Sequence, residues 1–363
     1  MKVDIDPVIE QILERALSGR EIKKKEAYQL MECTGNEFHA LCYTADFLRR
    51  KTIGDRVTFV VNRNINFTNI CEGSCTFCNF RDDDGFLLGI EEIVSRAKIP
   101  GITEVCIQGG LHPDITLDYY TDILKRIKEE RPKIHIHAFS PAEVNHMKEK
   151  SGLSVKEVLT ILKEAGLGSM PGTAAEILND SVRERICPQK IKTDQWVAII
   201  KTAHSLNIPT TATIMYGHVD SYTDRVDHLF LMKEIQKETG GFTEFVPLTF
   251  MHQNELGVAE NLRGATGFED TKLYCISRIV LNEWIPNLQV SWVKLGRKFA
   301  HVMLLCGAND IGGTLYEENI SKASGSVHGE VMHPEEFVEL IKDIGRAPAE
   351  RDTLYNVIKE YSA

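Results

Sequence analysis

The chain has 363 residues, 43% of them hydrophobic, and a formal net charge of −10. This excess of negative charge, with no basic stripe in the sequence, argues against nonspecific binding to nucleic acid phosphates. No apolar run approaches the ~20 residues of a membrane-spanning helix, and residues 1–7 contain no apolar signal segment. We therefore expect a cytoplasmic protein with a sizeable core, no nucleic acid partner and no membrane partner.

The first 52 residues carry the periodicity of helices. Apolar residues recur at helical spacing from Val8 to Leu17, just before Gly19, and again from Phe38 to Leu48. We predict that residues 1–52 form a helical N-terminal segment that packs as a cap on the domain that follows.

From residue 57 onward, short β-branched runs alternate with amphipathic helices. Strands are expected at residues 57–61 (continuing through 63–67), 104–108, 134–138, 210–216, 244–248 and 289–293, with weaker candidates at 168–170 and 311–315. Helices are expected at residues 117–130, 155–165, 194–206 and 224–237. This alternation indicates βαβ units and a parallel sheet. The sequence thus predicts an α/β fold, a TIM-like barrel, complete or partial, over residues 53–325, with a C-terminal extension of residues 326–363 packed on it and including a helix at 334–344.

Three cysteines lie within eight residues, and their spacing points to a metal centre. Cys71, Cys75 and Cys78 form a C-x3-C-x2-C motif. A 4Fe-4S cluster normally takes four cysteine ligands, so three leave one iron open to an outside ligand. Structural zinc needs four ligands, usually as two pairs, and the other six cysteines appear scattered, while disulfides do not suit a chain without secretory features. We predict an iron–sulfur cluster and keep zinc as the alternative.

Polar and glycine residues follow the next two predicted strands. Barrel enzymes place their chemistry on the loops after the strands. Gln108, Gly109 and Gly110 come at the end of the second strand, and paired glycines let a backbone approach a ligand closely. Ser140 and Glu143 come just after the third strand, at the expected mouth of the barrel.

Four ring-bearing side chains on or after the strands have competing interpretations. His135 and His137 alternate with isoleucines, and we expect them to fill the barrel lumen with their polar atoms satisfied by neighbours. Tyr216 and His218, near the end of the fifth strand, share one direction, as hydrogen-bonding or acid–base groups would. We therefore name Tyr216 and His218 as catalytic candidates.

Glu176 also has two interpretations. Thr173 and Glu176 have the spacing of a capping box, in which the two side chains cap the start of a helix reciprocally. This pattern predicts a structural role for Glu176, and binding of a ribose or of the substrate is the alternative.

With Phe77 just before its third cysteine, the C-x3-C-x2-C motif resembles the signature of the radical S-adenosylmethionine (SAM) superfamily. Members chelate SAM on the open iron and split it into methionine and a 5'-deoxyadenosyl radical, and they hold the SAM amino group with a glycine-rich turn. The resemblance implies a 4Fe-4S cluster and SAM as cofactors, with the cluster on Cys71, Cys75 and Cys78. Together with the residues placed at the barrel mouth, this gives the predicted cofactor-binding group, which comprises Phe77, Gln108, Gly109, Gly110, Ser140, Glu143 and Glu176.

Further stretches narrow the resemblance to one branch of the superfamily. Residues 62–71, 108–113, 168–176 and 212–218 are similar to the deazaflavin and menaquinone-precursor branch, above all to the tyrosine-cleaving subunits of FO synthase, over about residues 10–345. The resemblance implies cleavage of the Cα–Cβ bond of L-tyrosine and transfer of its 4-hydroxybenzyl group to 5-amino-6-(D-ribitylamino)uracil, with release of 2-iminoacetate. The product belongs to coenzyme F-420 biosynthesis, and a companion radical SAM subunit and a low-potential electron donor are the implied partners.

Two other functions remain as alternatives. A futalosine-pathway radical SAM synthase of menaquinone biosynthesis would share the barrel and the cluster but not the need for free tyrosine. An iron–sulfur electron carrier would favour four protein ligands for its cluster, and it would gain nothing from a barrel with polar loops.

Overall fold

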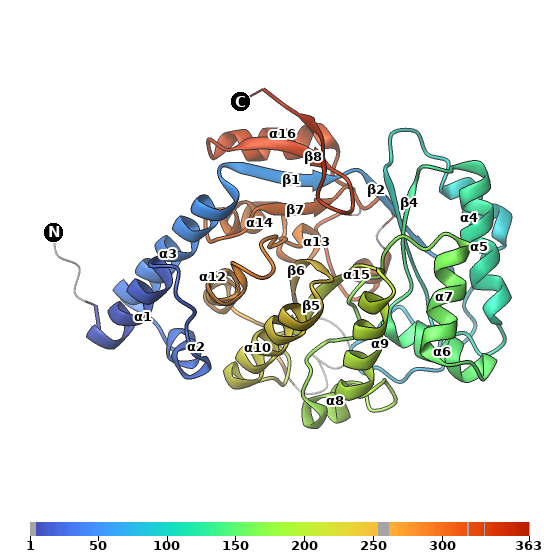
Figure 1. Ribbon diagram of the computed structural model, residues 1–363, viewed down its shortest axis with the longest axis horizontal. Helices are drawn as coiled ribbons and strands as arrows, with labels where there is room; N and C mark the ends of the chain where they lie inside the picture. Colours follow the sequence, from blue (N-terminus) through green and yellow to red (C-terminus); the bar gives the residue numbers. More distant parts are fainter. Residues whose placement is uncertain (1–4, 253–260, 318, 330, 363) are drawn as a thin grey trace.

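The computed structural model describes residues 5–252, 261–317, 319–329 and 331–362. Three helices, α1 (Pro7–Leu17), α2 (Lys24–Met31) and α3 (Gly35–Ile53), lie to one side of the molecule (Figure 1). Helix α1 begins with Pro7, and the carboxylate of Asp6 caps it by accepting a hydrogen bond from the Val8 N–H. Helices α1 and α3 lie where the apolar spacing predicts helices, and α2 is an additional helix between them. The limits of the predicted N-terminal segment stay a prediction.

Parallel strands form the centre of the molecule. Three ladders are present, in the orders β7-β1-β8-β9, β2-β3-β4 and β5-β6. The strands are β1 (Arg56–Val60), β2 (Asn62–Asn66), β3 (Glu104–Gln108), β4 (His135–Ala138), β5 (Thr210–Tyr216), β6 (Phe242–Thr249), β7 (Asp310–Gly313), β8 (Ala347–Arg351) and β9 (Val357–Glu360). All pairings in the ladders are parallel except that of β8 with β9.

Isolated parallel bridges connect the three ladders. They join His137 to Ser169, Met170 to Thr210, Phe245 to Leu288, and Gln289 to Asp310. The predicted α/β fold with parallel strands is confirmed, but the sheet is not one uninterrupted ladder. The weak strand candidate at 168–170 and the expected strand at 289–293 contribute only such bridges.

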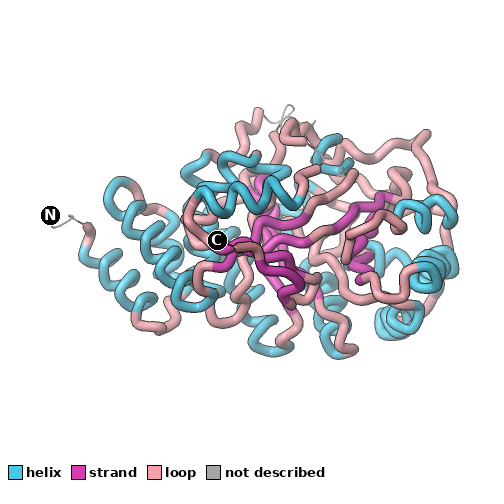
Figure 2. Tube along the Cα trace, turned by 90° about the horizontal axis from the view of Figure 1, so that it is seen from above, coloured by secondary structure: helices cyan, strands magenta, loops and turns pink. Residues whose placement is uncertain are grey.

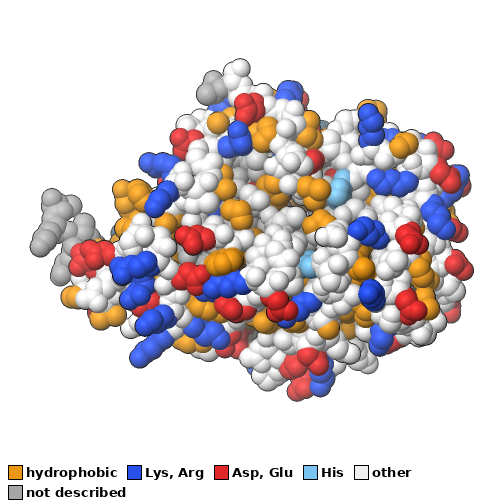
Figure 3. Space-filling model, viewed as in Figure 1, with side chains coloured by type: hydrophobic (Ala, Val, Ile, Leu, Met, Phe, Trp, Pro, Cys, Tyr) orange, Lys and Arg blue, Asp and Glu red, His pale blue; other side chains and the backbone are white. Residues whose placement is uncertain are grey.

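Helices cover the outside of the strands (Figures 1 and 2). They are α4 (Ile90–Arg96), α5 (Leu117–Glu130), α6 (Pro141–Ser151), α7 (Val155–Ala165), α8 (Asp180–Ile186), α9 (Thr193–Ser205), α10 (Tyr222–Thr239) and α12 (Gly267–Leu281). Val105 and Ile107 of β3 belong with Ile123, Leu124 and Ile127 of α5 to one fully buried apolar cluster. Burial of such side chains contributes ~2 kcal/mol each. On the face in Figure 3, acidic and basic side chains are intermingled.

The C-terminal region is part of the sheet and not only packed on it. After α13 (Trp292–Leu295), α14 (Arg297–Met303) and α15 (Asn319–Ala323), the chain forms α16 (Pro334–Asp343). Strand β8 then pairs in parallel with β1 over its whole length. Because of this pairing, residues from the end of the chain reach the interior, which the sequence analysis did not predict.

Two local predictions are wrong. The expected strand at 289–293 gives way to helix α13, which begins at Trp292. The predicted capping box does not form, because no helix begins at Thr173. Ala174 and Glu176 have positive φ angles of 64° and 46°, which a right-handed helix does not allow. In the described chain, no helix combines the length and the apolar character needed to cross a bilayer.

Candidate active site

A cavity of about 420 Å³ lies in the space that the strands surround. Alternate residues of the strands line it, since successive side chains of a strand point to opposite faces. They are Asn62, Asn64 and Asn66 of β2, Glu104, Cys106 and Gln108 of β3, Thr211, Thr213 and Met215 of β5, and Glu244, Val246 and Leu248 of β6. The wall formed by β2 and β3 is largely polar, whereas β6 becomes apolar beyond Glu244.

We call the region around Cys71, Cys75 and Cys78 the cysteine end of the cavity. All three cysteines line it. The Sγ of Cys71 accepts hydrogen bonds from the N–H groups of Gly73 (3.3 Å) and Leu111 (3.2 Å). Hydrogen bonds of this kind tune the potential of an iron–sulfur cluster, so the donor set fits such a group.

At least one pair of sulfur atoms among Cys71, Cys75 and Cys78 lies more than 4.8 Å apart. A four-iron cluster spreads its ligands more widely than a single zinc ion, whose Zn–S bonds are about 2.3 Å long. This spacing agrees with the predicted cluster.

The two glycines after β3 allow the cysteine loop to lie directly on the next loop. The N–H of Gly110 donates to the Thr68 carbonyl at 2.9 Å. A Cβ on Gly110 would lie 2.2 Å from the Ile70 carbonyl oxygen, and one on Gly109 would lie 2.5 Å from the Phe67 ring. Both positions thus require glycine for a close backbone approach, and both line the cavity as well.

Glu143 connects the glycine loop to helix α6. Its carboxylate accepts hydrogen bonds from the backbone N–H of Ser140 at 2.7 Å and of Gly109 at 3.1 Å. Ser140 accepts in return from the Glu143 N–H at 3.3 Å, which completes a capping box. Burial raises the pKa of Glu143 to about 7, although these hydrogen bonds act in the opposite direction. Ser140 and Glu143 both line the cavity, so the capping box of α6 is also part of the cavity wall.

Glu176 lines the cysteine end together with a lysine that the sequence analysis missed. The Nζ of Lys190 donates to Oε1 of Glu176 at 2.5 Å and lies 5.5 Å from the centre of the Phe77 ring. Burial disfavours the charge on Glu176, but Lys190, Arg183 and His218 outweigh it and lower its pKa. Burial likewise opposes the charge on Lys190, but Cys75, Glu176 and Cys187 raise its pKa. A half-buried cation therefore lines the cavity together with the cysteines.

Tyr216 and His218 do not line the cavity. The Tyr216 hydroxyl donates to Oδ1 of Asp270 at 2.7 Å. The ring of His218 lies 3.1 Å from the Met215 carbonyl oxygen and accepts from the Val219 N–H at 2.8 Å. Their partners are protein groups, so their placement supports a structural role and gives no support to the predicted catalytic one.

His135 and His137 are held by a shared serine. A ring nitrogen of each lies 2.7 Å from Oγ of Ser169. Burial lowers the pKa of His137 to about 4, so its ring stays neutral at physiological pH. The expectation that neighbours satisfy these two histidines is confirmed, and His137 lines the cavity.

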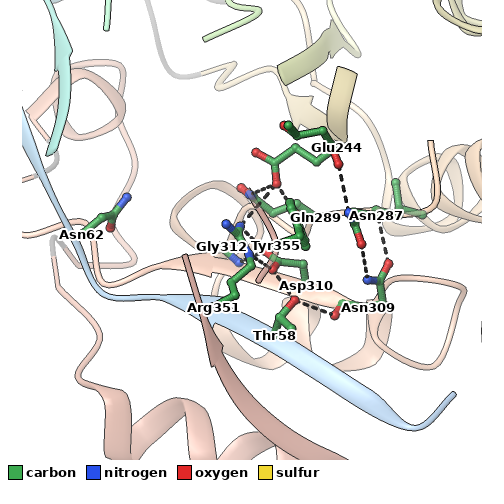
Figure 4. Close-up of polar contacts among 12 residues, drawn as sticks. Thr58, Asn62, Glu244, Asn287, Gln289, Asn309, Asp310, Gly312, Arg351 and Tyr355 are labelled. Carbon is green, nitrogen blue, oxygen red and sulfur yellow. Dashed lines mark hydrogen bonds and ion pairs between the residues drawn. The ribbon is translucent and has the colours of Figure 1, made fainter. Parts of the chain in front are cut away.

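The opposite end of the cavity, which we call the deep end, carries a buried polar network (Figure 4). Arg351 donates to Oδ2 of Asp310 at 2.5 Å and lies 3.4 Å from Oε2 of Glu244. The same Glu244 oxygen accepts from the Gln289 amide at 2.7 Å and from the Tyr355 hydroxyl. Burial raises the pKa of Glu244 to about 7 although Arg351 acts to lower it. The residues that line the deep end are Asn62, Glu104, Glu244, Gln289, Arg351 and Thr353.

Two family models match successive parts of the chain. The first, the radical SAM superfamily, covers residues 65–232, and the second, the CofH/MqnC C-terminal region, covers residues 239–362. The cysteine end thus lies in the first region, whereas Glu244, Gln289, Arg351 and Thr353 of the deep end lie in the second.

Solved structures share the fold. The crystal structure of methylornithine synthase (PylB) superposes with a TM-score of 0.73 at 16% identity and covers 93% of this chain and 97% of its own. HydG, a maturase of the [FeFe]-hydrogenase, gives a TM-score of 0.75 at 17% identity and covers 95% of this chain and 77% of its own. These likenesses show the fold alone.

Sequence relatives identify the family. The 5-amino-6-(D-ribitylamino)uracil–L-tyrosine 4-hydroxyphenyl transferase of Archaeoglobus fulgidus is 58% identical over 86% of this chain and 92% of its own. The proteins of the same name from Methanocaldococcus jannaschii and Methanothermobacter thermautotrophicus are 54% and 52% identical over 94% and 96% of this chain, and 98% of each of them is covered. The predicted cofactors, a 4Fe-4S cluster and SAM, agree with this superfamily. The chain belongs to the radical SAM superfamily and, within it, to the 5-amino-6-(D-ribitylamino)uracil–L-tyrosine 4-hydroxyphenyl transferase family.

Proposed function

We propose that the protein transfers the 4-hydroxybenzyl group of L-tyrosine to 5-amino-6-(D-ribitylamino)uracil, in the biosynthesis of the coenzyme F-420 chromophore. One observation carries this proposal: a single cavity reaches from the three cysteines to a polar deep end built by the family-specific C-terminal region. Relatives that carry this activity in their name are 50–58% identical over 86–98% of the chain. The bridges between the ladders further support a complete ring of strands around this cavity.

At the cysteine end, Cys71, Cys75 and Cys78 would hold the 4Fe-4S cluster. When bound, the cluster and SAM supply a 5'-deoxyadenosyl radical. Lys190 is suited to hold the carboxylate of SAM, because it is a half-buried cation beside Cys75 and lines the cavity. The amino group of SAM would find acceptors at the loop of Gly109 and Gly110.

Between the two ends, β2 offers a buried hydrogen-bond acceptor to a ligand. Oδ1 of Asn66 is buried and has no hydrogen-bond partner in the described part of the protein, although the residue lines the cavity. Buried polar atoms normally have a partner. A ligand with an N–H donor, such as the amino group of tyrosine, would satisfy this oxygen. The apolar surface of Val246 and Leu248 on the facing side suits an aromatic ring.

The deep end suits the acceptor substrate. A uracil ring and a ribityl chain present many hydrogen-bond donors and acceptors, and Asn62, Glu244 and Gln289 offer amide and carboxyl groups of both kinds. The protein would thus place the two substrates in sequence along one cavity and exclude water from the radical steps. We also propose a cytoplasmic location, a low-potential electron donor and a companion radical SAM subunit that completes the deazaflavin ring.

Anaerobic turnover tests the proposed function. Protein with a reconstituted cluster is incubated with SAM, a strong reductant, tyrosine and 5-amino-6-(D-ribitylamino)uracil, and the products are analysed by mass spectrometry. We expect an adduct of the uracil heavier by one hydroxybenzyl group, which disappears when tyrosine is omitted. Formation of 5'-deoxyadenosine without this adduct would contradict the substrate assignment and favour a futalosine-type enzyme. Absence of 5'-deoxyadenosine would contradict the enzyme assignment.

A further inference from the structure

Three cysteines outside the cysteine end converge in the structure. They are Cys42 on α3, Cys275 on α12 and Cys306, which follows α14, and their sulfur atoms all lie within 4.8 Å of one another. These cysteines are far apart in the sequence, and the expectation that they are scattered in the fold is wrong. The trio forms where the N-terminal helix α3 packs along α12. Cys275 and Cys306 are buried, whereas Cys42 is partly exposed, so solvent ions can reach the site.

Buried guanidinium groups hold the segment that carries Cys306. Arg278 lies one helical turn after Cys275, is 1% exposed, and donates to the Gly307 carbonyl at 2.7 Å. Arg346 is 5% exposed and donates to the carbonyls of Leu304 (2.7 Å) and Ala308 (3.1 Å). A Cβ placed on Gly307 would lie 2.9 Å from the Arg278 Cβ, so the packing here is close.

These two arginines bring positive charge into the interior. Their hydrogen-bond acceptors are carbonyl and side-chain amide oxygens. Neither forms an ion pair with a carboxylate among the residues that the structure describes. Buried charges are normally paired, because the loss of hydration is costly. The Asp46 carboxylate attracts both guanidinium groups and the Asp55 carboxylate attracts that of Arg346, but both carboxylates form ion pairs with Arg49. An anionic centre close to Cys306 would add to this opposite charge.

We propose that Cys42, Cys275 and Cys306 form a second metal site, structural in role, for a thiophilic divalent cation such as Zn²⁺. Three thiolates and one Zn²⁺ carry a net charge of −1, which complements the two guanidinium groups. Zn–S bonds of about 2.3 Å at tetrahedral angles place the sulfurs about 3.8 Å apart, which small side-chain rotations achieve from the observed spacing. Binding releases the three thiol protons to solvent. Water, which can reach the partly exposed Cys42, would complete the coordination.

The site would fasten the N-terminal helices to the barrel. Its ligands come from three segments that are far apart in the sequence, so unfolding separates them. A metal that binds only the folded state shifts the folding equilibrium towards that state. The proposed role is therefore stabilisation, separate from the chemistry at the cysteine end.

Zinc binding to the protein with its iron–sulfur cluster in place tests this proposal. The reconstituted protein is equilibrated with Zn²⁺ and freed of unbound metal, and iron and zinc are counted by elemental mass spectrometry. X-ray absorption at the zinc edge then reports the zinc ligands without interference from iron. We expect one zinc per chain in addition to the full iron content, with three sulfur neighbours at about 2.3 Å.

Matched variants identify the ligands. Cys42→Ser and Cys306→Ser should lose the zinc, keep the iron and keep SAM cleavage. The control is Cys33→Ser, since Cys33 is also a buried thiol, at the end of α2, but outside the trio; it should keep the zinc. A chelator should lower the Tm of wild type and of Cys33→Ser but not that of Cys42→Ser. Because Cys42→Ser removes the partly exposed ligand, it tests the metal site even if Cys306→Ser does not fold. Three results would overturn the proposal. They are equal zinc contents in Cys42→Ser and Cys33→Ser, coordination of the zinc by oxygen and nitrogen only, and a disulfide within the trio.

Discussion

Lys190 and Glu176 form an ion pair with a distance of 2.5 Å between Nζ and Oε1, at the end of the cavity where the three cysteines of the motif lie. Glu176 has a left-handed backbone conformation, with φ of 46°, and Lys190 approaches it from a loop after α8. The pair therefore depends on tertiary structure in both of its partners. It places one positive charge close to Cys75 without leaving it uncompensated.

Removing the lysine alone should affect both stability and SAM binding. In Lys190→Met, the half-buried carboxylate of Glu176 would lose its partner, which should cost about 1–3 kcal/mol of unfolding free energy. The double variant Lys190→Met/Glu176→Gln removes both charges and should recover most of this loss. Both variants should bind SAM at least about tenfold more weakly in equilibrium binding, a change of about 1.4 kcal/mol. Recovery of SAM binding in the double variant would show that Lys190 serves only to neutralise Glu176.

Each cysteine of the motif should be required for SAM cleavage. Replacing Cys71, Cys75 or Cys78 singly with Ala leaves too few thiolates for the cluster, so we expect loss of bound iron and of 5'-deoxyadenosine formation. The far-UV circular dichroism should stay that of a folded protein. Cys306→Ala is the control with the same chemical change, and it should keep the iron of the cluster. Loss of iron from Cys306→Ala would reveal a cluster ligand outside the motif.

Glu143 should make the free energy of unfolding depend on pH in a way that Glu157, the residue at the same position of the capping box of α7, does not. Its folded-state pKa of about 7 lies above the unfolded value of about 4.3. Its favourable contribution is therefore fully present below pH ~4.3 and is lost as pH rises through ~7. When the pH rises from 4.5 to 7.5, wild type should therefore lose a few kcal/mol of unfolding free energy relative to Glu143→Gln.

Glu157 provides the matched control for this pH series. It closes the same type of capping box with Ser154 on α7 but is exposed, and hydrogen bonds from Ser154 lower its pKa. Its contribution is present above its unfolded pKa and is lost as pH falls through the folded value. The difference between wild type and Glu157→Gln should therefore stay nearly constant from pH 4.5 to pH 7.5 and change, with the opposite sign, only as pH falls below about 4.3. Denaturant unfolding at a series of pH values measures both, and equal slopes for the two variants would contradict the burial of Glu143.

Tyr216 should matter for stability more than for catalysis. In Tyr216→Phe the carboxylate of Asp270 loses a buried hydrogen bond of 2.7 Å, which should cost about 1–3 kcal/mol. Since Tyr216 does not line the cavity, the rate of SAM cleavage in the folded variant should stay within about threefold of wild type, a difference of less than 1 kcal/mol in activation free energy. A large loss of rate without loss of stability would restore the catalytic interpretation.

The features that could be predicted from the sequence are local in it. The cysteine motif, the two glycines after β3 and most helices depend on residues close together in the chain. Strand β5 shows where this fails: its seven residues are all buried, so the sequence does not show which face meets the cavity. Thr211, Thr213 and Met215 do, and Tyr216 does not. Lys190, Arg351 and the trio of Cys42, Cys275 and Cys306 were missed because packing between distant segments brings them into place.

The deep end should determine the affinity for the acceptor substrate. Gln289 lines the cavity and its amide N–H donates to Oε2 of Glu244 at 2.7 Å. Replacing it with Leu keeps similar volume but removes polar groups that a uracil or ribityl group would use. A site built for hydrogen bonds discriminates strongly against mismatched polar groups. We expect the Kd of 5-amino-6-(D-ribitylamino)uracil to rise at least about tenfold, or by about 1.4 kcal/mol, while SAM binding is unchanged.

Asn287→Leu provides the control for this last substitution. Asn287 belongs to the same polar network, where its amide donates to the Thr243 carbonyl at 3.0 Å, but it does not line the cavity. A general loosening of the network would weaken acceptor binding in both variants, whereas a direct contact would weaken it only in Gln289→Leu. Anaerobic calorimetry with the acceptor separates the two cases. Equal affinities in wild type and Gln289→Leu would place the acceptor elsewhere in the cavity, because a buried apolar side chain cannot replace the lost hydrogen bonds.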